Sequence, residues 1–197
     1  MEHWNHNTAY HPFLVDIARD RDGDVIDVGC GEGLLVERLA AVSRTVRGVD
    51  SDEEAIARAR LRMSGLSNAT VNRADFTAMD IEPSSYDLVT MVASLHHLDL
   101  EEALRRTKTI LRPEGKLVVV GLSANKTVAD HAWSAVAFPV VRVLSSVRRE
   151  NRDVGVATVA PRESLREIRE TAGRLLPDSR LRRGLYYRYI LTWTKPG

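Results

Sequence analysis

The chain has 197 residues, which suits one domain with a proper hydrophobic core. Its 28 basic and 27 acidic residues give a net charge of +1, so the composition indicates no nucleic-acid partner. It has no apolar stretch of about 20 residues to span a membrane, no signal peptide, and only one cysteine, Cys30, which excludes an internal disulfide. We therefore expect a cytoplasmic protein that has no membrane partner.

The first 13 residues, MEHWNHNTAYHPF, are rich in aromatic and histidine side chains. A disordered terminus seldom carries so many large rings, so we predict that residues 1–20 cover a binding site, with a frayed terminus as the alternative. The histidines His3, His6 and His11 lack the spacing of metal ligands, and we expect no metal site.

The segment Val25–Gly33, VIDVGCGEG, reads as a buried strand followed by a glycine turn. Gly29, Gly31 and Gly33 occupy every second position, and apolar residues at helical spacing follow directly. In an open α/β sheet, ligands bind at such a turn, outside the carboxyl end of the strand. Asp27 lies within the strand. Because a buried carboxylate is costly, we expect it to face a donor on the ligand or the loop.

A second acid, Asp50, ends the next predicted strand, Val46–Asp50. An acid about 20 residues beyond such glycines is placed to accept hydrogen bonds from ribose hydroxyls. A helix is predicted over residues 52–63, with Ser51 as its N-cap. The glycine turn and the two acids together predict a site for a nucleoside-containing ligand.

Two adjacent histidines follow the fourth predicted strand, residues 86–93, which is apolar after its second residue, as in a strand buried on both faces. A histidine with a pKa of about 6.5 accepts a proton near neutral pH, so His96 or His97 is a candidate general base. The alternative for either ring is packing against the loop.

Apolar periodicity predicts further strands and helices in alternation, which favours a doubly wound parallel sheet. The other predicted helices cover residues 11–19, 34–41, 99–111 and 161–173, and the other predicted strands cover 69–72, 116–121, 181–184 and 185–194.

Several of these segments resemble the class I S-adenosylmethionine-dependent methyltransferases, specifically the small type 11 group. The matching segments are DVGCGEG (27–33), GVD (48–50), ADF (74–76), YDLVTMVASLHHL (86–98) and LRPEGKLVVVG (111–121). The resemblance implies an α/β, doubly wound, seven-stranded and mostly parallel sheet. In this Rossmann-like methyltransferase fold the seventh strand is antiparallel and lies between the fifth and the sixth.

The resemblance also implies the cofactor, S-adenosyl-L-methionine, and its product, S-adenosyl-L-homocysteine. In the family, an acid accepts a hydrogen bond from the adenine amino group, and the next residue flanks the adenine ring. In this sequence these residues are Asp75 and Phe76. Backbone carbonyls near Val92–Ala93 meet the methionine amino group, and the N-terminal segment folds over the cofactor. The cofactor-binding residues so implied are Asp27, Gly29, Cys30, Gly31, Gly33, Asp50, Ser51, Asp75, Phe76, Val92, Ala93, Tyr10 and His11.

Residues 123–160 form a connection that the minimal fold does not explain. Connections of this length are usually functional lids or binding elements. We predict a cap that binds the methyl acceptor within a single methyltransferase domain covering residues 1–197. The alternatives are a subunit interface, which would make the protein a homodimer, or additional core.

We expect methyl transfer to the oxygen, nitrogen or carbon of a small-molecule acceptor such as a secondary metabolite, and we favour a hydroxyl. A nicotinamide-dependent dehydrogenase is one alternative, although the G-x-G-x-G spacing differs from the G-x-G-x-x-G of dinucleotide binders. Two others remain: an RNA-modifying methyltransferase, which the low net charge disfavours, and a non-catalytic scaffold or sensor that binds the same cofactor.

Overall fold

The computed structural model describes residues 6–124, 160–184 and 188–197. Its strands are β1 (Asp24–Val28), β2 (Thr45–Asp50), β3 (Ala69–Arg73), β4 (Tyr86–Val92), β5 (Leu111–Gly121), β6 (Arg180–Arg183) and β7 (Tyr189–Thr194). Its α-helices are α1 (His11–Arg21), α2 (Leu34–Ala40), α3 (Glu53–Met63), α4 (Leu100–Ile110) and α6 (Leu165–Leu175), with short 3-10 helices η1 (Thr8–Tyr10) and η2 (Leu95–His97).

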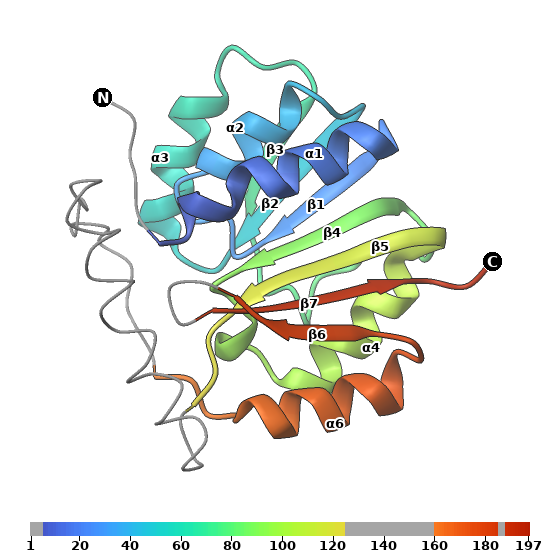
Figure 1. Ribbon diagram of the computed structural model, residues 1–197. Coiled ribbons are helices and arrows are strands. Elements are labelled where there is room, and N and C mark those ends of the chain that lie inside the picture. The colour runs from blue at the N-terminus through green and yellow to red at the C-terminus, as the bar shows by residue number, and fades with distance from the viewer. Residues whose placement is uncertain (1–5, 125–159, 185–187) are drawn as a thin grey trace.

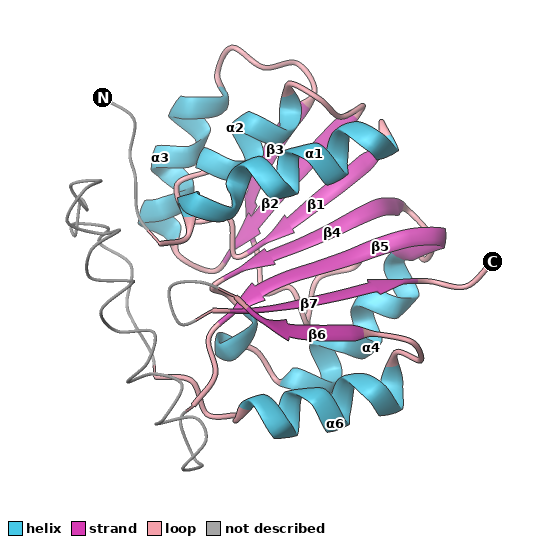
Figure 2. Cartoon of the chain, viewed as in Figure 1, coloured by secondary structure: helices cyan, strands magenta, loops and turns pink. Residues whose placement is uncertain are grey.

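The strands form one sheet in the order β3-β2-β1-β4-β5-β7-β6. β1 pairs in parallel with β2 and β4, whereas β7 runs antiparallel to both β5 and β6. Helices α1, α2 and α3 cover one face and α4 and α6 the other (Figures 1 and 2). The predicted fold is therefore confirmed, including the seventh strand between the fifth and the sixth. Strand order reverses between β1 and β4, and ligands bind at such a switch point.

The two faces of the sheet carry separate apolar clusters. Val25 and Leu88 belong to the cluster under α1–α3, whereas their neighbours Ile26 and Val89 belong to the cluster under α4 and α6. Side chains alternate between faces along a strand, so a sheet covered on both sides needs apolar residues at successive positions. This requirement explains the continuous apolar runs of the central strands.

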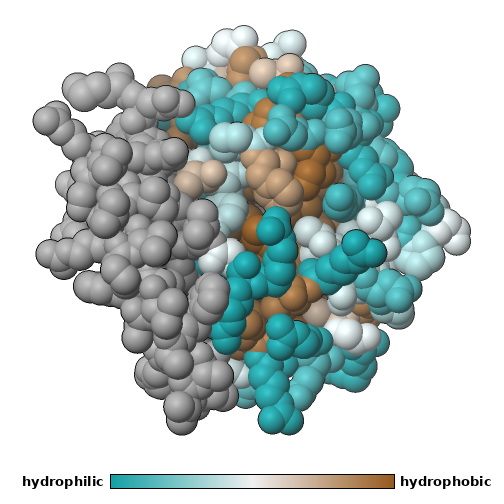
Figure 3. Space-filling view, in the orientation of Figure 1, coloured by the Kyte–Doolittle hydropathy of each residue, from teal (hydrophilic) through white to brown (hydrophobic). Residues whose placement is uncertain are grey.

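The surface is mainly hydrophilic in the view of Figure 3, and the largest apolar area lies in the middle of that face. Among the described residues, Leu61 on α3 is the one large hydrophobic side chain that is strongly exposed. None of the helices formed by the described residues is long and apolar enough to cross a membrane.

An ion-pair cluster ties the amino ends of β1 and β4 together. Arg112 Nη1 lies 2.6 Å from Asp87 Oδ2, and its Nη2 lies 2.9 Å from Asp24 Oδ2. Arg44 Nη2 approaches Asp24 Oδ2 at 2.6 Å. Because these guanidinium groups hydrogen-bond the Asp24 carboxylate, its pKa lies well below the ordinary value. Both acids at this end of the sheet are thus neutralised by the protein's own cations.

The predicted N-cap of α3 is wrong by one residue. Asp52, not Ser51, caps the helix, and its Oδ1 accepts the backbone N–H groups of Glu54 at 2.9 Å and Ala55 at 3.2 Å. The Asp52 N–H itself donates to Asp50 Oδ1 at 2.9 Å, which places Ser51 in the preceding turn.

Two strands differ in extent or environment from the prediction. β5 begins at Leu111, which pairs with Tyr86, and after a register shift Lys116 pairs with Leu88. The predicted strand covered only residues 116–121, so β5 begins earlier than predicted. On β7, Ile190 is buried as well as its neighbours Tyr189 and Leu191, because Tyr10 packs against it from the other face of the sheet.

Some predictions concern residues outside the described part of the chain. Residues 125–159 hold nearly all of the predicted cap and of the alternative dimer interface, and residues 1–5 hold His3. The acceptor-binding and dimer roles therefore stay predictions.

Candidate functional site

The glycine turn after β1 is a tight loop anchored on β2. Gly29 and Gly31 adopt φ angles of 75° and 52°, in the left-handed region that favours glycine. A Cβ on Gly29 would lie 2.2 Å from the Ser94 Cβ, whereas no atom lies within 4 Å of a Cβ placed on Gly31. The N–H groups of Gly29 and Cys30 both donate to the Val49 carbonyl. The turn is therefore closely packed at Gly29 and open at Gly31, where another molecule can approach the backbone.

Asp50 connects the end of β2 to this turn. Its Oδ2 accepts the Gly31 N–H at 2.8 Å, and its Oδ1 accepts the Asp52 N–H at 2.9 Å. A carboxylate offers about four lone-pair sites, so these two bonds leave acceptor capacity for the hydroxyls of a ligand. The exposed Ser51 follows directly.

Asp27 is buried in β1, with 2% of its surface exposed. Its Oδ1 accepts the Thr90 hydroxyl of β4 at 2.7 Å. Burial raises the pKa of Asp27 to about 7, and the nearby charge of Asp50 acts in the same direction. Within the described residues no cation forms an ion pair with Asp27.

Cys30 is also buried, and burial together with the two carboxylates raises the pKa of its thiol. A thiol is a poor nucleophile when its thiolate is disfavoured. Cys30 therefore contributes packing and its backbone to the turn.

The loop after β3 carries the predicted adenine-binding pair. Asp75 is exposed, and its Oδ1 accepts both the N–H of Thr77 at 2.8 Å and its hydroxyl at 2.7 Å. These bonds lower the pKa of Asp75 and fix the carboxylate. Phe76, in contrast, is 2% exposed and lies in the core, with the Arg106 guanidinium carbon 5.7 Å from its ring centroid. A contact from Phe76 to an adenine would therefore come from its backbone.

The chain turns sharply where β4 ends. Ala93 has a φ of 53°, and its N–H donates to the Val120 carbonyl at 2.7 Å. The Ser94 hydroxyl then donates to the Val28 carbonyl at 2.5 Å. This bond joins the residues after Val92 to the strand that leads into the glycine turn.

The histidine pair comes next, in η2. The ring centroids of His96 and His97 are 4.1 Å apart, and His96 is buried while His97 is exposed. Burial, with the charges of His97 and Arg188, lowers the pKa of His96 to about 4. His96 is therefore neutral at physiological pH.

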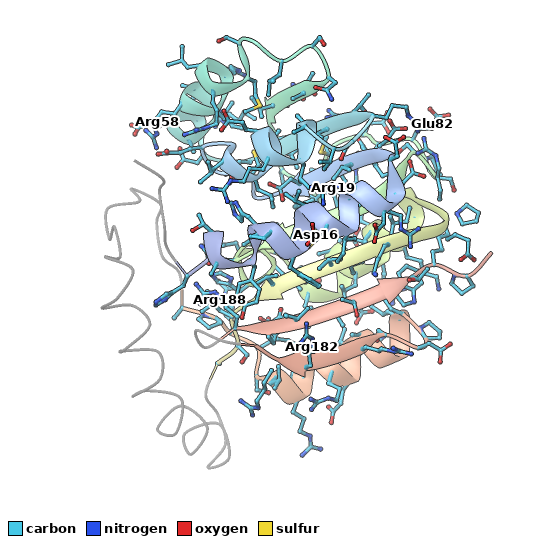
Figure 4. The ribbon with its side chains drawn as sticks, turned by 45° about the horizontal axis from the view of Figure 1, so that its top comes forward. Asp16, Arg19, Arg58, Glu82, Arg182 and Arg188 are labelled. Atoms are coloured by element: carbon cyan, nitrogen blue, oxygen red, sulfur yellow. The ribbon has the colours of Figure 1, made fainter. Side chains whose placement is uncertain are left out.

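The N-terminal elements η1 and α1 approach this histidine pair through Arg188. Arg188 Nε and Nη2 donate to Asn7 Oδ1 at 3.2 and 2.8 Å, and Figure 4 shows Arg188 beside the amino end of α1. Tyr10 is buried against Val120 and Ile190, while His11 is buried with its Nδ1 unsatisfied within the described residues. The structure thus brings the N-terminal segment close to His96.

Sequence reasoning missed three side chains that shape this site: Thr90, Ser94 and Arg188. Thr90 is a polar residue at the centre of an apolar strand, which is a detectable signal for a specific buried hydrogen bond. Arg188 is one of several arginines in the C-terminal part of the sequence, and nothing in its local sequence separates it from them.

Known proteins resemble this chain in both sequence and fold. The family described as "Methyltransferase domain" matches residues 25–115. An uncharacterised methyltransferase of Mycobacterium tuberculosis is 31% identical over 196 residues, which cover 98% of each chain. A ubiquinone biosynthesis O-methyltransferase of Sodalis glossinidius is 29% identical over 169 residues, covering 82% of this chain and 66% of that protein.

Solved structures share the fold. A Pyrococcus horikoshii protein superposes with a TM-score of 0.69 at 19% identity, covering 95% of this chain and 88% of that one. A putative S-adenosyl-L-methionine-dependent methyltransferase of Methanococcus maripaludis gives a TM-score of 0.67 at 19% identity, covering 97% and 87%.

The chain belongs to the class I S-adenosylmethionine-dependent methyltransferases, in the small type 11 group. It is an enzyme that uses S-adenosyl-L-methionine. The site fits this cofactor in two respects: the backbone at Gly31 is open to a ligand, and the acids Asp27 and Asp50 flank the turn that would receive a cationic molecule.

Proposed function

We propose that this methyltransferase transfers the methyl group to a hydroxyl of a small-molecule acceptor bound at the carboxyl end of β4. The observation that carries the proposal is the histidine pair in η2, one ring buried and one exposed, joined to the glycine turn by the bond from Ser94 to Val28. An exposed imidazole beside a cofactor site suits an acceptor that must lose a proton.

The cofactor would be held by side chains and backbone around the turn. Gly29, Cys30, Gly31 and Gly33 would present their backbone to its methionine part, and Asp50 would accept from the ribose hydroxyls. Asp75 keeps Oδ2 for the adenine amino group, because its two bonds to Thr77 use Oδ1. We also assign to the cofactor site Asp27, Ser51, Phe76, Val92, Ala93, Tyr10 and His11.

When bound, the cofactor supplies a methyl group already activated on a positively charged sulfur. The protein must then align the acceptor and remove its proton. His97 would accept that proton on its imidazole as the oxygen–carbon bond forms, while the neutral His96 ring supports its orientation. Holding the two reactants in line supplies much of the rate acceleration, because it removes the entropy cost of their encounter.

One of the relatives named above supports a hydroxyl as the acceptor. The ubiquinone biosynthesis relative is an O-methyltransferase by name. The net charge of +1 supports a small molecule over RNA, since RNA-binding surfaces concentrate positive charge.

Mass spectrometry of candidate acceptors tests the proposal. Phenols and matched anilines are incubated with the protein and S-adenosylmethionine, and the products are searched for one added methyl group. We expect methylation of a phenol and not of its matched aniline. Methylation of anilines alone, or of RNA alone, would contradict the hydroxyl assignment.

A pair of histidine variants tests the base. His97→Gln should lower turnover by about 100-fold, the lower end of a general-base contribution, and should leave S-adenosylhomocysteine affinity unchanged. His96→Gln serves as the matched control and should lower turnover less. Full activity of both variants would remove the general-base role.

A further inference from the structure

The glycine turn is held by α3 as well as by β2. Helix α3 packs beside α2, which begins directly after Gly33 (Figure 1). A Cβ on Gly33 would lie 3.1 Å from the Ala59 Cβ and 3.3 Å from the Met63 Cε, so a glycine here lets α3 approach the turn closely. Ala59 and Met63 are both buried. The face of α3 that carries them therefore lies directly against the end of the turn.

Two arginines of α3 reach Glu32, the residue before this glycine. Arg62 Nε donates to the Glu32 carbonyl at 3.1 Å, and Arg58 Nε donates to Glu32 Oε1 at 2.8 Å. Arg58, labelled in Figure 4, projects from α3. The two arginines are four residues apart, so they are neighbours on the helix surface. The backbone and the side chain of Glu32 are thus bound by two cations from one helix.

Arg62 also ties the turn to α2. Its Nη1 lies 3.0 Å from Oε2 of Glu37, which is in the first turn of α2. The Arg62 side chain is 29% exposed, against 42% for Arg58 and 55% for Arg60, the other arginines of α3. Polar interactions gain strength as water is excluded from them. Of these three arginines, Arg62 therefore makes the strongest interactions with its partners.

These bonds fix the turn on both sides of the Gly31–Glu32 peptide. Before it, the Gly31 N–H donates to Asp50 Oδ2 at 2.8 Å. After it, Arg62 holds the Glu32 carbonyl, and the Gly33 N–H donates back within the turn at 3.0 Å. The intervening peptide is therefore held in one orientation, at the position where the turn is open to a ligand.

We propose that Arg62 is a positioning residue for methyl transfer, which holds the Glu32 carbonyl and so keeps the glycine turn in the conformation that binds S-adenosylmethionine. Arg58 assists by holding the Glu32 carboxylate. Gly31 and Gly33 adopt φ angles of 52° and 76°, and because glycine has many other conformations available, the turn needs support from outside. The inference rests on the proposed placement of the cofactor at this turn, and it goes further by assigning a role to two residues that do not touch the ligand.

The binding kinetics of Arg62→Met test the inference without an acceptor. The variant keeps most of the aliphatic side chain and removes both of its bonds. It should bind S-adenosylhomocysteine about tenfold more weakly, the scale of a hydrogen bond made by a charged group. Affinity falls in proportion to the fraction of molecules in the binding conformation, so the loss should lie in the association rate constant, with dissociation unchanged. Surface plasmon resonance measures both rate constants.

Three variants of α2 and α3 serve as controls. Arg60→Met makes the same charge change on the same helix, but Arg60 pairs with Glu53 at 3.7 Å and should leave binding unchanged. Glu37→Gln removes the ion pair of Arg62 and leaves its bond to the turn, so affinity should fall by less than about threefold. Arg62→Lys keeps the charge and a donor, and should recover part of the affinity lost in Arg62→Met.

Hydrogen exchange of the unliganded protein locates the effect. In Arg62→Met the Gly33 N–H should exchange about tenfold faster than in the wild type, because the turn opens more often. The amides of β1, which are bonded to both neighbouring strands, should exchange as in the wild type. A general loss of stability would instead speed exchange in the strand as well.

Wild-type affinity in Arg62→Met would overturn the inference, as would an equal loss in Arg60→Met or in Glu37→Gln, or a loss confined to dissociation. Wild-type affinity in both Arg62→Lys and Arg58→Met would also overturn it, so the test does not depend on whether Arg62→Met folds. All of these results leave the proposed function intact. Binding of S-adenosylhomocysteine by the wild type tests the placement of the cofactor, and the acceptor screen tests the hydroxyl assignment.

Discussion

Carboxylates have different partners at the two ends of the central strands. At the amino ends, Asp24 and Asp87 are both paired with Arg112 and with Arg44. At the carboxyl ends, Asp27 and Asp50 hydrogen-bond only to hydroxyl and backbone N–H groups of the described chain. The same residue type therefore stabilises the fold at one end, and at the other provides negative charge and acceptor capacity for a ligand.

The ends also differ in their backbone. The carboxyl end has three glycines with positive φ and a non-glycine residue, Ala93, with φ of 53°. Positive φ also occurs at the amino ends, where Asp22, Ser84 and Glu114 adopt it in turns. The carboxyl end therefore differs in having the glycines and the unpaired charge, and it is the end where the switch point predicts a ligand.

Gly29→Ala should give the largest loss of stability at the carboxyl end. The new Cβ would lie 2.2 Å from the Ser94 Cβ, on a residue with φ of 75°, so we expect a loss of about 3 kcal/mol in the free energy of unfolding. Urea denaturation measures it. Gly31→Ala is the matched control, because its Cβ meets no atom within 4 Å, and it should lose only about 1 kcal/mol. Equal losses in the two variants would contradict the distinction between a packed and an open glycine.

Removing one charge at each end should change stability with opposite signs. Asp27→Asn should stabilise the unliganded protein at pH 8 by about 2 kcal/mol, since it relieves an unpaired buried charge whose pKa is raised. Asp24→Asn should destabilise by about 1–2 kcal/mol, because it removes the partner of two arginines. Urea denaturation at pH 8 checks both.

The pH dependence follows from the signs of the two pKa shifts. The stabilising contribution of Asp24, whose pKa is lowered, is present above about pH 4 and is lost as the pH falls. The destabilising contribution of Asp27, whose pKa is raised to about 7, is absent below pH 4 and complete above 7. At pH 4, therefore, Asp27→Asn should be no more stable than the wild type. Destabilisation by Asp27→Asn at pH 8 would contradict this account of the carboxyl end.

The sequence predicted the features that depend on local pattern. The strand, glycine turn and helix at residues 25–41 required only apolar spacing and glycines, and Asp50 followed from its distance along the chain. The histidines at 96 and 97 were likewise identified from their place after an apolar strand. All of these signals lie within a few residues of the feature they predict.

Features that depend on contacts across the fold were not predictable. Asp52 rather than Ser51 caps α3 because Asp50 holds the Asp52 N–H, and only the folded turn shows this. Arg188 reaches Asn7, 181 positions away, so no local pattern distinguishes it from neighbouring arginines. Phe76 is buried beneath Arg106 of α4, and its burial follows from helix packing, not from the loop sequence.

The most direct test of the account is calorimetric titration of Asp50→Asn with S-adenosylhomocysteine. Asp50 is the carboxyl-end acid assigned to the ribose of the ligand. We predict binding about tenfold weaker than wild type or more, the scale of a hydrogen bond to a charged group, while Asp24→Asn binds as wild type does. Wild-type affinity in Asp50→Asn, or an equal loss in Asp24→Asn, would contradict the assignment of function to one end of the sheet and stability to the other.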